Sequence, residues 1–352
     1  VGVGYATLPS NTTGTYNTAI GSSTLYYNTT ASYNTAVGYQ ALYSNQTSQF
    51  NTAIGYYALR SAVNVTGVYD GGNTAVGYNA GYNLTTGYQN TLLGGRAWDW
   101  GICGGNLTTG IGNTFIGAAA GAGVTTGSSS IAIGVQAAGS NLSDSVIIGN
   151  QAAIASTGTR NVVIGTSASG GAGFAPGYAL TTGSYNTFIG TNAVGMSVTT
   201  GSYNTILGGY SGNQGGLDIR TASNYIVLSD GAGNPRAWQS STGGWYQYNN
   251  SASWSTTSDA RLKENITPLT SGLDVILALD PVEFDYISSG EHDEGFLAQE
   301  YEKVLPRQVT EKDDGYLSIT RNLDPYLVKA IQEQQELILS LKAEIDLLKG
   351  AK

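Results

Sequence analysis

The sequence has one cysteine, Cys103, and one histidine, His292, among 352 residues. A single cysteine excludes an intrachain disulfide framework and a cysteine-based metal site. The chain also lacks a run of about 18 apolar residues, the length that a membrane-spanning helix requires. Its N-terminus lacks the basic and then apolar layout of a secretory signal. We therefore expect no metal, no cofactor and no insertion into a membrane.

Lysine is absent from the first 257 residues, which hold five Asp and five Arg and carry no net formal charge. The remaining 95 residues hold 19 acidic residues and 10 Lys or Arg, so the whole net charge of −9 lies there. This break in composition predicts a domain boundary near residue 257. Because neither part has a basic surface, we expect no nucleic-acid partner.

Glycine is plentiful, and it marks a repeat. A unit of the form Asn-Thr-x-(Ile/Val/Leu)-Gly occupies 17–21, returns 17 residues later at 34–38, and continues with insertions and looser copies to 204–208. Such a period predicts a parallel β-solenoid, in which short runs of β-formers alternate with glycine turns and neighbouring coils stack. A second motif, (Leu/Val)-Thr-Thr-Gly, as at 84–87, predicts a second strand in many coils. We expect a mainly β shaft over residues 1–210.

The repeats resemble the β-roll heads of trimeric autotransporter adhesins and the related repeats of phage tail fibres. This resemblance implies a left-handed parallel β-roll built from three chains. Residues 211–257 lose the repeat and gain Gly, Ser and Trp, and we expect strands within 224–231 and 245–248. Because the open edge of a terminal coil would otherwise pair with another chain, we interpret this segment as a β-capped connector.

Aromatic residues are the candidates for ligand binding in the shaft. Flat amphipathic rings suit the faces of sugars. Trp98 and Trp100 are the strongest candidates because they lie in an insertion between repeats, and inserted loops often carry function. Tyr39, Tyr56 and Tyr78 allow the same interpretation, with packing between coils as the alternative.

The segment 255–266, Ser-Thr-Thr-Ser-Asp-Ala-Arg-Leu-Lys-Glu-Asn-Ile, resembles the start of the endosialidase-type intramolecular chaperone domain of phage tail spikes and tail fibres. The resemblance continues through 295–300 and 304–306 to 327–335, so we expect a small α+β chaperone domain over residues 258–352. By resemblance, Ser258 is the nucleophile and Lys263 its base in a single-turnover self-cleavage. The bond that breaks lies on one side of Ser258 or the other, next to Thr257 or next to Asp259.

Two other interpretations of these residues stay open. Ser258-Asp259 also suits a helix N-cap, with Lys263 as a solvated surface residue. A Ser/His/Asp triad would have to use His292, whose acidic neighbours indicate a solvated loop.

Helix signals are clear near the C-terminus. Asp324-Pro325 is typical of a helix start, and Ile331, Ile338 and Ile345 alternate with leucines at steps of three and four. This heptad predicts a coiled coil over about residues 325–349. Ile at a with Leu at d favours dimers in parallel coils, whereas the family resemblance implies a trimer.

Together these features indicate a structural virion protein, namely a homotrimeric bacteriophage tail fibre or tail spike made in the host cytoplasm. Its shaft would bind a host-surface glycan or protein and join upstream tail components, and its C-terminal domain would assemble three chains and then release itself. Two alternatives are open: a bacterial or phage adhesin with an inactive, retained chaperone domain, and a glycan-degrading tail spike. The second needs two carboxylates about 5–10 Å apart, and the shaft has only five scattered acids.

Overall fold

The structure of the protein is a computed structural model. It describes residues 1–63, 71–97, 101–165, 167, 174–191, 193–248, 258–287, 290–312, 314–320 and 322–350. The chain divides into two compact units, Val1–Ser255 and Thr256–Lys352, each with a fold of its own.

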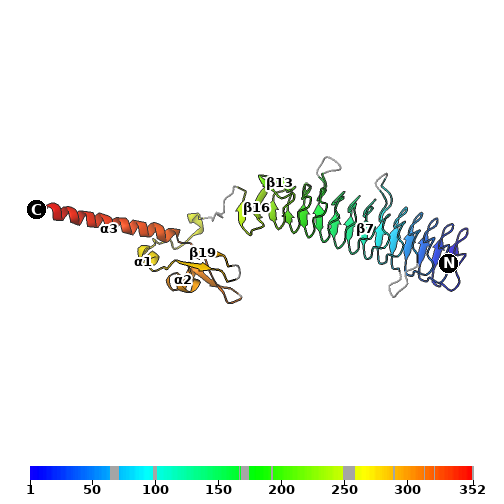
Figure 1. Cartoon of the computed structure of the whole chain (residues 1–352), viewed down its shortest axis with the longest axis horizontal. Coiled ribbons are helices and arrows are strands. Elements are labelled where there is room, and N and C mark those ends of the chain that lie inside the picture. The colour runs from blue at the N-terminus through cyan, green and yellow to red at the C-terminus, as the bar shows by residue number, and fades with distance from the viewer. Residues whose placement is uncertain are drawn as a thin grey trace. The chain divides into compact units, whose positions relative to one another are not determined.

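The first unit is a parallel β-solenoid with one short strand in each coil (Figure 1). Each strand pairs in parallel with the strand of the next coil, as Thr114 of β7 pairs with Ile131 of β8. The predicted mainly β solenoid is therefore confirmed. The parallel strands are β1 (Gly2–Val3), β2 (Thr18–Ile20), β3 (Thr35–Val37), β4 (Thr52–Ile54), β5 (Thr74–Val76), β6 (Thr91–Leu93), β7 (Thr114–Ile116), β8 (Ile131–Ile133), β9 (Val146–Ile148), β10 (Val162–Gly165), β11 (Thr187–Gly190), β12 (Thr205–Leu207) and β15 (Ile226–Ser229).

The ladder continues past residue 210 and ends in an antiparallel cap. β15 pairs in parallel with β12, and β16 (Pro235–Gln239) and β17 (Trp245–Gln247) extend the same sheet with antiparallel pairing. β13 (Asn213–Gln214) and β14 (Leu217–Asp218) form a separate hairpin. Trp238 of β16 joins the core of the shaft. These strands occupy the last parallel edge, which would otherwise be free to pair with another chain.

Each coil buries the middle residue of its strand and exposes part of the residues on either side. Ala19, Phe115 and Phe188 are such middle residues, and none of them is exposed. The glycine that follows the strand turns the chain where the next coil is very close. A Cβ on Gly117 would lie 2.5 Å from the carbonyl oxygen of Gly134, and the φ angle there is +132°. Both facts exclude a larger residue.

The second motif does not form a strand. At 84–87 the side chain of Leu84 is buried, and the amides of Thr85 and Gly87 both donate to the carbonyl of Thr108 in the next coil. Because two amides converge on one carbonyl, the alternating pattern of a strand ladder does not form. The prediction of a second strand in many coils is wrong, and the motif is a turn that places one aliphatic side chain in the core.

The asparagine that opens each repeat forms a buried ladder along the shaft. The amide of Asn113 donates to Oδ1 of Asn90 at 3.0 Å, and Nδ2 of Asn90 donates to the carbonyl of Gly110 at 2.9 Å. Nδ2 of Asn90 also donates to Oδ1 of Asn73 in the preceding coil at 3.0 Å, so one side chain satisfies polar groups of both neighbouring coils, which fixes how they stack. The ladder consists of Asn17, Asn34, Asn51, Asn73, Asn90, Asn113, Ser130, Ser145, Asn161, Asn186 and Asn204.

The second unit is a small α+β fold with a long terminal helix. β18 pairs with β19 and β20 pairs with β21, both antiparallel, and Leu279, Tyr301 and Leu305 form its core. The predicted helix start is confirmed at Asp324. No helix among the described residues combines the length and the apolar character needed to cross a bilayer. The elements are η2 (Ala260–Leu262), α1 (Leu273–Leu277), β18 (Val282–Asp285), β19 (His292–Gly295), α2 (Ala298–Val304), η3 (Pro306–Gln308), β20 (Val309–Glu311), β21 (Leu317–Ile319) and α3 (Asp324–Gly350).

The asparagine ladder yields a stability prediction. Asn90→Ala removes the acceptor of the Asn113 amide and the donor to Gly110, and we expect a loss of roughly 2–5 kcal/mol from buried groups left unpaired. Asn90→Ser is the matched control, because serine stands at this position in two coils, and it should lose less. Thermal unfolding and hydrogen exchange at the Asn113 amide measure both effects. Equal stability of the alanine variant and wild type would contradict the role of the ladder.

Candidate functional site

Ser258 and Lys263 lie together at the start of the second unit. Nζ of Lys263 donates a hydrogen bond to Oγ of Ser258 at 2.5 Å. The 3-10 turn η2 separates the two residues and folds the chain back, so that side chains five positions apart meet. Both side chains are exposed in the single chain. The pair has the geometry of a nucleophile beside its base.

Asp259 holds the turn between them. Its Oδ1 accepts the backbone amide of Arg261 at 2.9 Å, which makes Asp259 the N-cap of η2. The Arg261 guanidinium also binds both carboxylate oxygens, and these contacts hold the pKa of Asp259 below its usual value. The amide of Lys263 closes the turn on the carbonyl of Ala260. The capping interpretation thus applies to Asp259, and it is compatible with the pairing of Ser258 and Lys263.

The other predicted residues contribute no further part to this pair. Thr257, the residue on the N-terminal side of Ser258, lies outside the described residues. His292 forms a cross-strand pair with Asp285 of β18, with Nδ1 at 2.8 Å from Oδ1, and both side chains are exposed. Among the described residues His292 bonds to Asp285 and not to Ser258, so the histidine triad has no geometric support.

The shaft aromatics divide into two groups. Trp98 and Trp100 lie outside the described residues. Tyr39, Tyr56 and Tyr78 stack on one another in successive coils, with ring centroids 5.3 Å apart. Tyr56 lies between the other two rings, so the stacking supports the packing interpretation, while all three side chains keep an exposed part.

The described acids of the first unit are each next to an arginine. Asp144 pairs with Arg160, and Asp218 and Asp230 pair with Arg220 and Arg236. No cluster of three His, Cys, Asp or Glu side chains that could hold a metal ion occurs in the described ranges. A carboxylate paired with an arginine differs from the two neighbouring carboxyl groups that glycosidase chemistry uses.

Glu333 of α3 fixes the segment that follows the Ser258/Lys263 pair. Its Oε2 accepts the amides of Leu273 and Gly272 at 2.7 and 3.1 Å, at the start of α1. The backbone hydrogen bond from Leu273 is the main reason that the pKa of Glu333 is lowered, with help from Gly272 and Lys329. Gly272 packs directly on the backbone of α3, where a Cβ would lie 2.4 Å from the Ala330 nitrogen. The α1–α3 junction is therefore a close and charge-assisted contact.

The chain thus combines a parallel β-solenoid with a small α+β unit that opens with an exposed Ser/Lys pair and ends in a long helix. A family model described as chaperone of endosialidase matches residues 258–310. The matched segment begins at Ser258 and includes Lys263, and together with the β-solenoid it fits a tail fibre with an endosialidase-type chaperone. Searches of the curated proteins and of the solved structures found no match.

Some parts of this site carry a signal in the sequence, and others do not. The Ser258/Lys263 pair could be named from the family resemblance. The clamp of Asp259 on Arg261 lies in the same segment and could have been found from its Asp-x-Arg spacing, which suits a capped turn. Glu333 has no local signal, because its partners are 60 residues away.

The Glu333 contact gives a pH prediction. A carboxylate whose pKa is lower in the folded state contributes stability that is complete above its unfolded value, near pH 4.3, and that is lost as the pH falls through the lower folded value. We expect the amides of Gly272 and Leu273 to lose hydrogen-exchange protection below about pH 4, and Glu333→Gln to lose it already at pH 7. Glu336→Gln, one turn along α3, is the control. Equal protection of these amides in both variants would show that the Glu333 carboxylate does not stabilise the junction.

Proposed function

We propose that this chain is the shaft and terminal chaperone of a homotrimeric phage tail fibre or tail spike that attaches to a host surface and cleaves itself at Ser258. The observation that carries the cleavage is the hydrogen bond between Lys263 and Ser258 inside the segment that matches the chaperone family. Its virion location, receptor and upstream tail partners are parts of the same proposal.

Assembly is supported by an exposed aliphatic file along the shaft. We define this file as the third residue of each strand, which includes Ile20, Ile54, Ile116 and Leu207, each about 36–42% exposed. The strands lie about 4.8 Å apart, so the file repeats at that interval over the whole ladder. A long apolar surface of this kind marks an interaction site. A second copy of the array has the matching period, and identical chains are therefore the partner that fits.

The second unit supports assembly in another way. In the described part of this unit, few apolar side chains besides Leu279, Tyr301, Leu305 and Ala330 are buried, which is a small core for its size. The heptad residues Ile331, Ile338 and Ile345 of α3 are 47–65% exposed. We propose that α3 completes its burial as a three-stranded coiled coil, which would bring three chains into one register before the repeats pair.

The cleavage follows from the same association. Lysine takes up a serine proton only as a neutral amine, and desolvation favours that form. Because Lys263 is exposed in the single chain, neighbouring copies have to supply the desolvation. Oγ of Ser258 would then attack the carbonyl carbon of Thr257 while its proton passes to Nζ of Lys263. The C–N bond would break as Nζ returns that proton to the leaving amine of Ser258, and an ester between Thr257 and Oγ would remain. Water would hydrolyse the resulting ester and free the carboxylate of Thr257.

Self-cleavage is tested by replacing each member of the pair. We expect the wild type to give two fragments that meet at Ser258, whereas Ser258→Ala and Lys263→Ala remain at 36.5 kDa. Lys263→Arg should also stay intact, since a guanidinium keeps its proton. Lys303→Ala is the control, because that exposed lysine pairs with Glu300 on α2. Intact-mass spectrometry reads both the cleavage and its position, and fragments in both alanine variants would exclude the pair.

Association is tested on the aliphatic file. We expect wild type to be trimeric in native mass spectrometry. The double variant Ile54→Asp/Ile116→Asp should lose most of its trimer, because two charges in each chain would be buried where the aliphatic files of neighbouring chains meet. Val135→Asp is the matched control, since Val135 is 40% exposed and lies outside the strands. Association through the aliphatic file would be contradicted if wild type were monomeric at micromolar concentration, or if the control dissociated as much as the double variant.

A further inference from the structure

One column of side chains along the shaft changes character in its middle. The column is the fifth residue after the glycine of each repeat, and in the first coils it holds Tyr26, Tyr43, Arg60 and Tyr82. Tyr26 and Tyr43 stack at 5.2 Å, and the Arg60 guanidinium lies over the rings of Tyr43 and Tyr82. These large side chains fill that edge of the solenoid.

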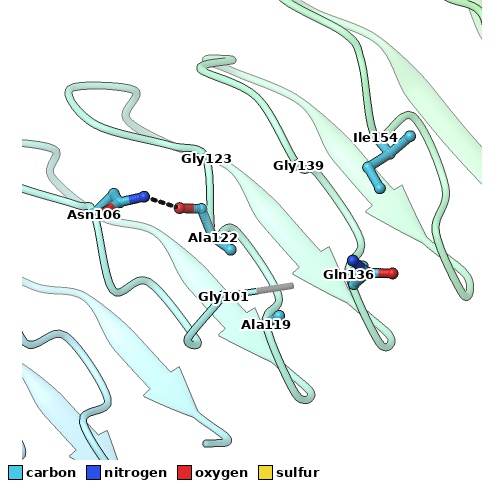
Figure 2. Close-up of a pocket in the computed structure, with 8 residues that line it drawn as sticks. All are labelled: Gly101, Asn106, Ala119, Ala122, Gly123, Gln136, Gly139 and Ile154. Carbon is cyan, nitrogen blue, oxygen red and sulfur yellow. Dashed lines mark hydrogen bonds between the residues drawn. The ribbon is translucent and has the colours of Figure 1, made fainter. Parts of the chain in front are cut away.

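The next three coils carry small residues at the same place. Gly105 takes the position after Tyr82, because the amide of Asn83 donates to its carbonyl just as the amide of Ser61 donates to the carbonyl of Tyr82. Ala122 and Gly139 follow, and Ile154 then restores a large side chain. The result is a hollow of about 300 Å³ in the surface of the shaft, bordered by Ile154 (Figure 2).

Stacking explains part of this composition. A Cβ on Gly139 would lie 2.5 Å from Cγ1 of Ile154, so glycine is required there by the fold. Packing alone does not explain the polar side chains that border the hollow. Asn106 and Gln136 come from different coils, and Figure 2 shows both at the same hollow.

Each of these two amides is fixed at one end and free at the other. Nδ2 of Asn106 donates to the carbonyl of Ala122 at 2.8 Å, which leaves its Oδ1 as an acceptor. Oε1 of Gln136 accepts from Nε2 of Gln151 at 2.8 Å, which leaves its own Nε2 as a donor. The Gln136 side chain is 7% exposed as a whole, and its Nε2 is not among the buried, unpartnered side-chain atoms of the described residues, so this donor is accessible from the hollow. Solvent or a ligand hydroxyl can therefore bond both amides.

We propose that this hollow binds one neutral hexose unit of a surface glycan. A sugar hydroxyl can accept from Nε2 of Gln136 while another donates to Oδ1 of Asn106, and the methyl group of Ala122 faces the C–H groups of the ring. The described residues that line the hollow carry no charge, which favours a neutral sugar over an acidic one. The proposal deepens the attachment role proposed above and is independent of the self-cleavage.

The test fills the hollow with a residue that the column already accepts. Ala122→Tyr copies the Tyr82 position into the hollow, and Ala118→Tyr in the same coil is the control, because Tyr39, Tyr56 and Tyr78 occupy its equivalent positions. The whole chain is titrated with glucose, galactose, mannose and N-acetylglucosamine, and binding is followed by saturation-transfer NMR. We expect wild type and the control to bind at least one sugar with roughly millimolar affinity and Ala122→Tyr to lose roughly tenfold or more.

A second variant keeps the proposal testable if tyrosine does not fit. Gln136→Glu retains the acceptor for Gln151 and removes the free donor, so binding of the same sugar should weaken while the shaft stays folded. No binding of any sugar by wild type, or equal binding by wild type and both variants, would overturn the proposal. So would a loss of trimer in Ala122→Tyr alone, which would make the hollow a contact between copies.

Attachment is measured separately, by co-sedimentation of the whole chain with a panel of bacterial strains. Cell binding that survives Ala122→Tyr and is not inhibited by the sugars would exclude the hollow and leave attachment standing. Sugar binding at the hollow without binding to any strain would support the hollow and contradict attachment.

Discussion

The hydrogen bond from each ladder amide to the asparagine or serine of the preceding coil is the interaction on which the shaft depends. Coils this short bury little apolar surface, since the middle residue of the strand is often alanine, as at Ala36 and Ala53. Hydrophobic burial is non-directional, and it would tolerate a slip by one coil or a tilt. A buried amide that bonds both neighbours tolerates neither, because each displacement leaves polar atoms unpaired.

The period of the repeat predicted the solenoid because each close contact between coils requires a glycine, and these glycines recur at a fixed position of the repeat. The tertiary role of the repeat asparagine could not be read in the same way. Asparagine also favours turns, and its ladder becomes visible only when coils are superposed. The Leu-Thr-Thr-Gly motif misled for a related reason: its threonines are β-formers, but their amides converge on one carbonyl, a geometry that local propensity does not encode.

The two units differ in their charge and in the size of their cores. The shaft carries no net charge, whereas the second unit is strongly acidic and has a small core. Ser258 and Lys263 stand at the start of the second unit, in a turn that Asp259 caps. The resemblance named this pair, but the cap, and the contact between Glu333 and the start of α1, depend on partners that only the folded chain brings together.

The serines that replace asparagine in the ladder move coil-to-coil bonds to other side chains. At Ser130 and Ser145 the hydroxyl donates to a carbonyl of its own coil, so at the ladder position one side-chain bond, from an amide to Oγ, joins each coil to the next. An asparagine coil such as that of Asn90 makes additional bonds to both neighbours. Between the two serine coils, Oδ1 of the exposed Asn141 accepts the amides of Thr125, Thr126 and Gly127. A force pulling along the axis of the solenoid would therefore be carried there at the surface, by Asn141, as well as inside the ladder.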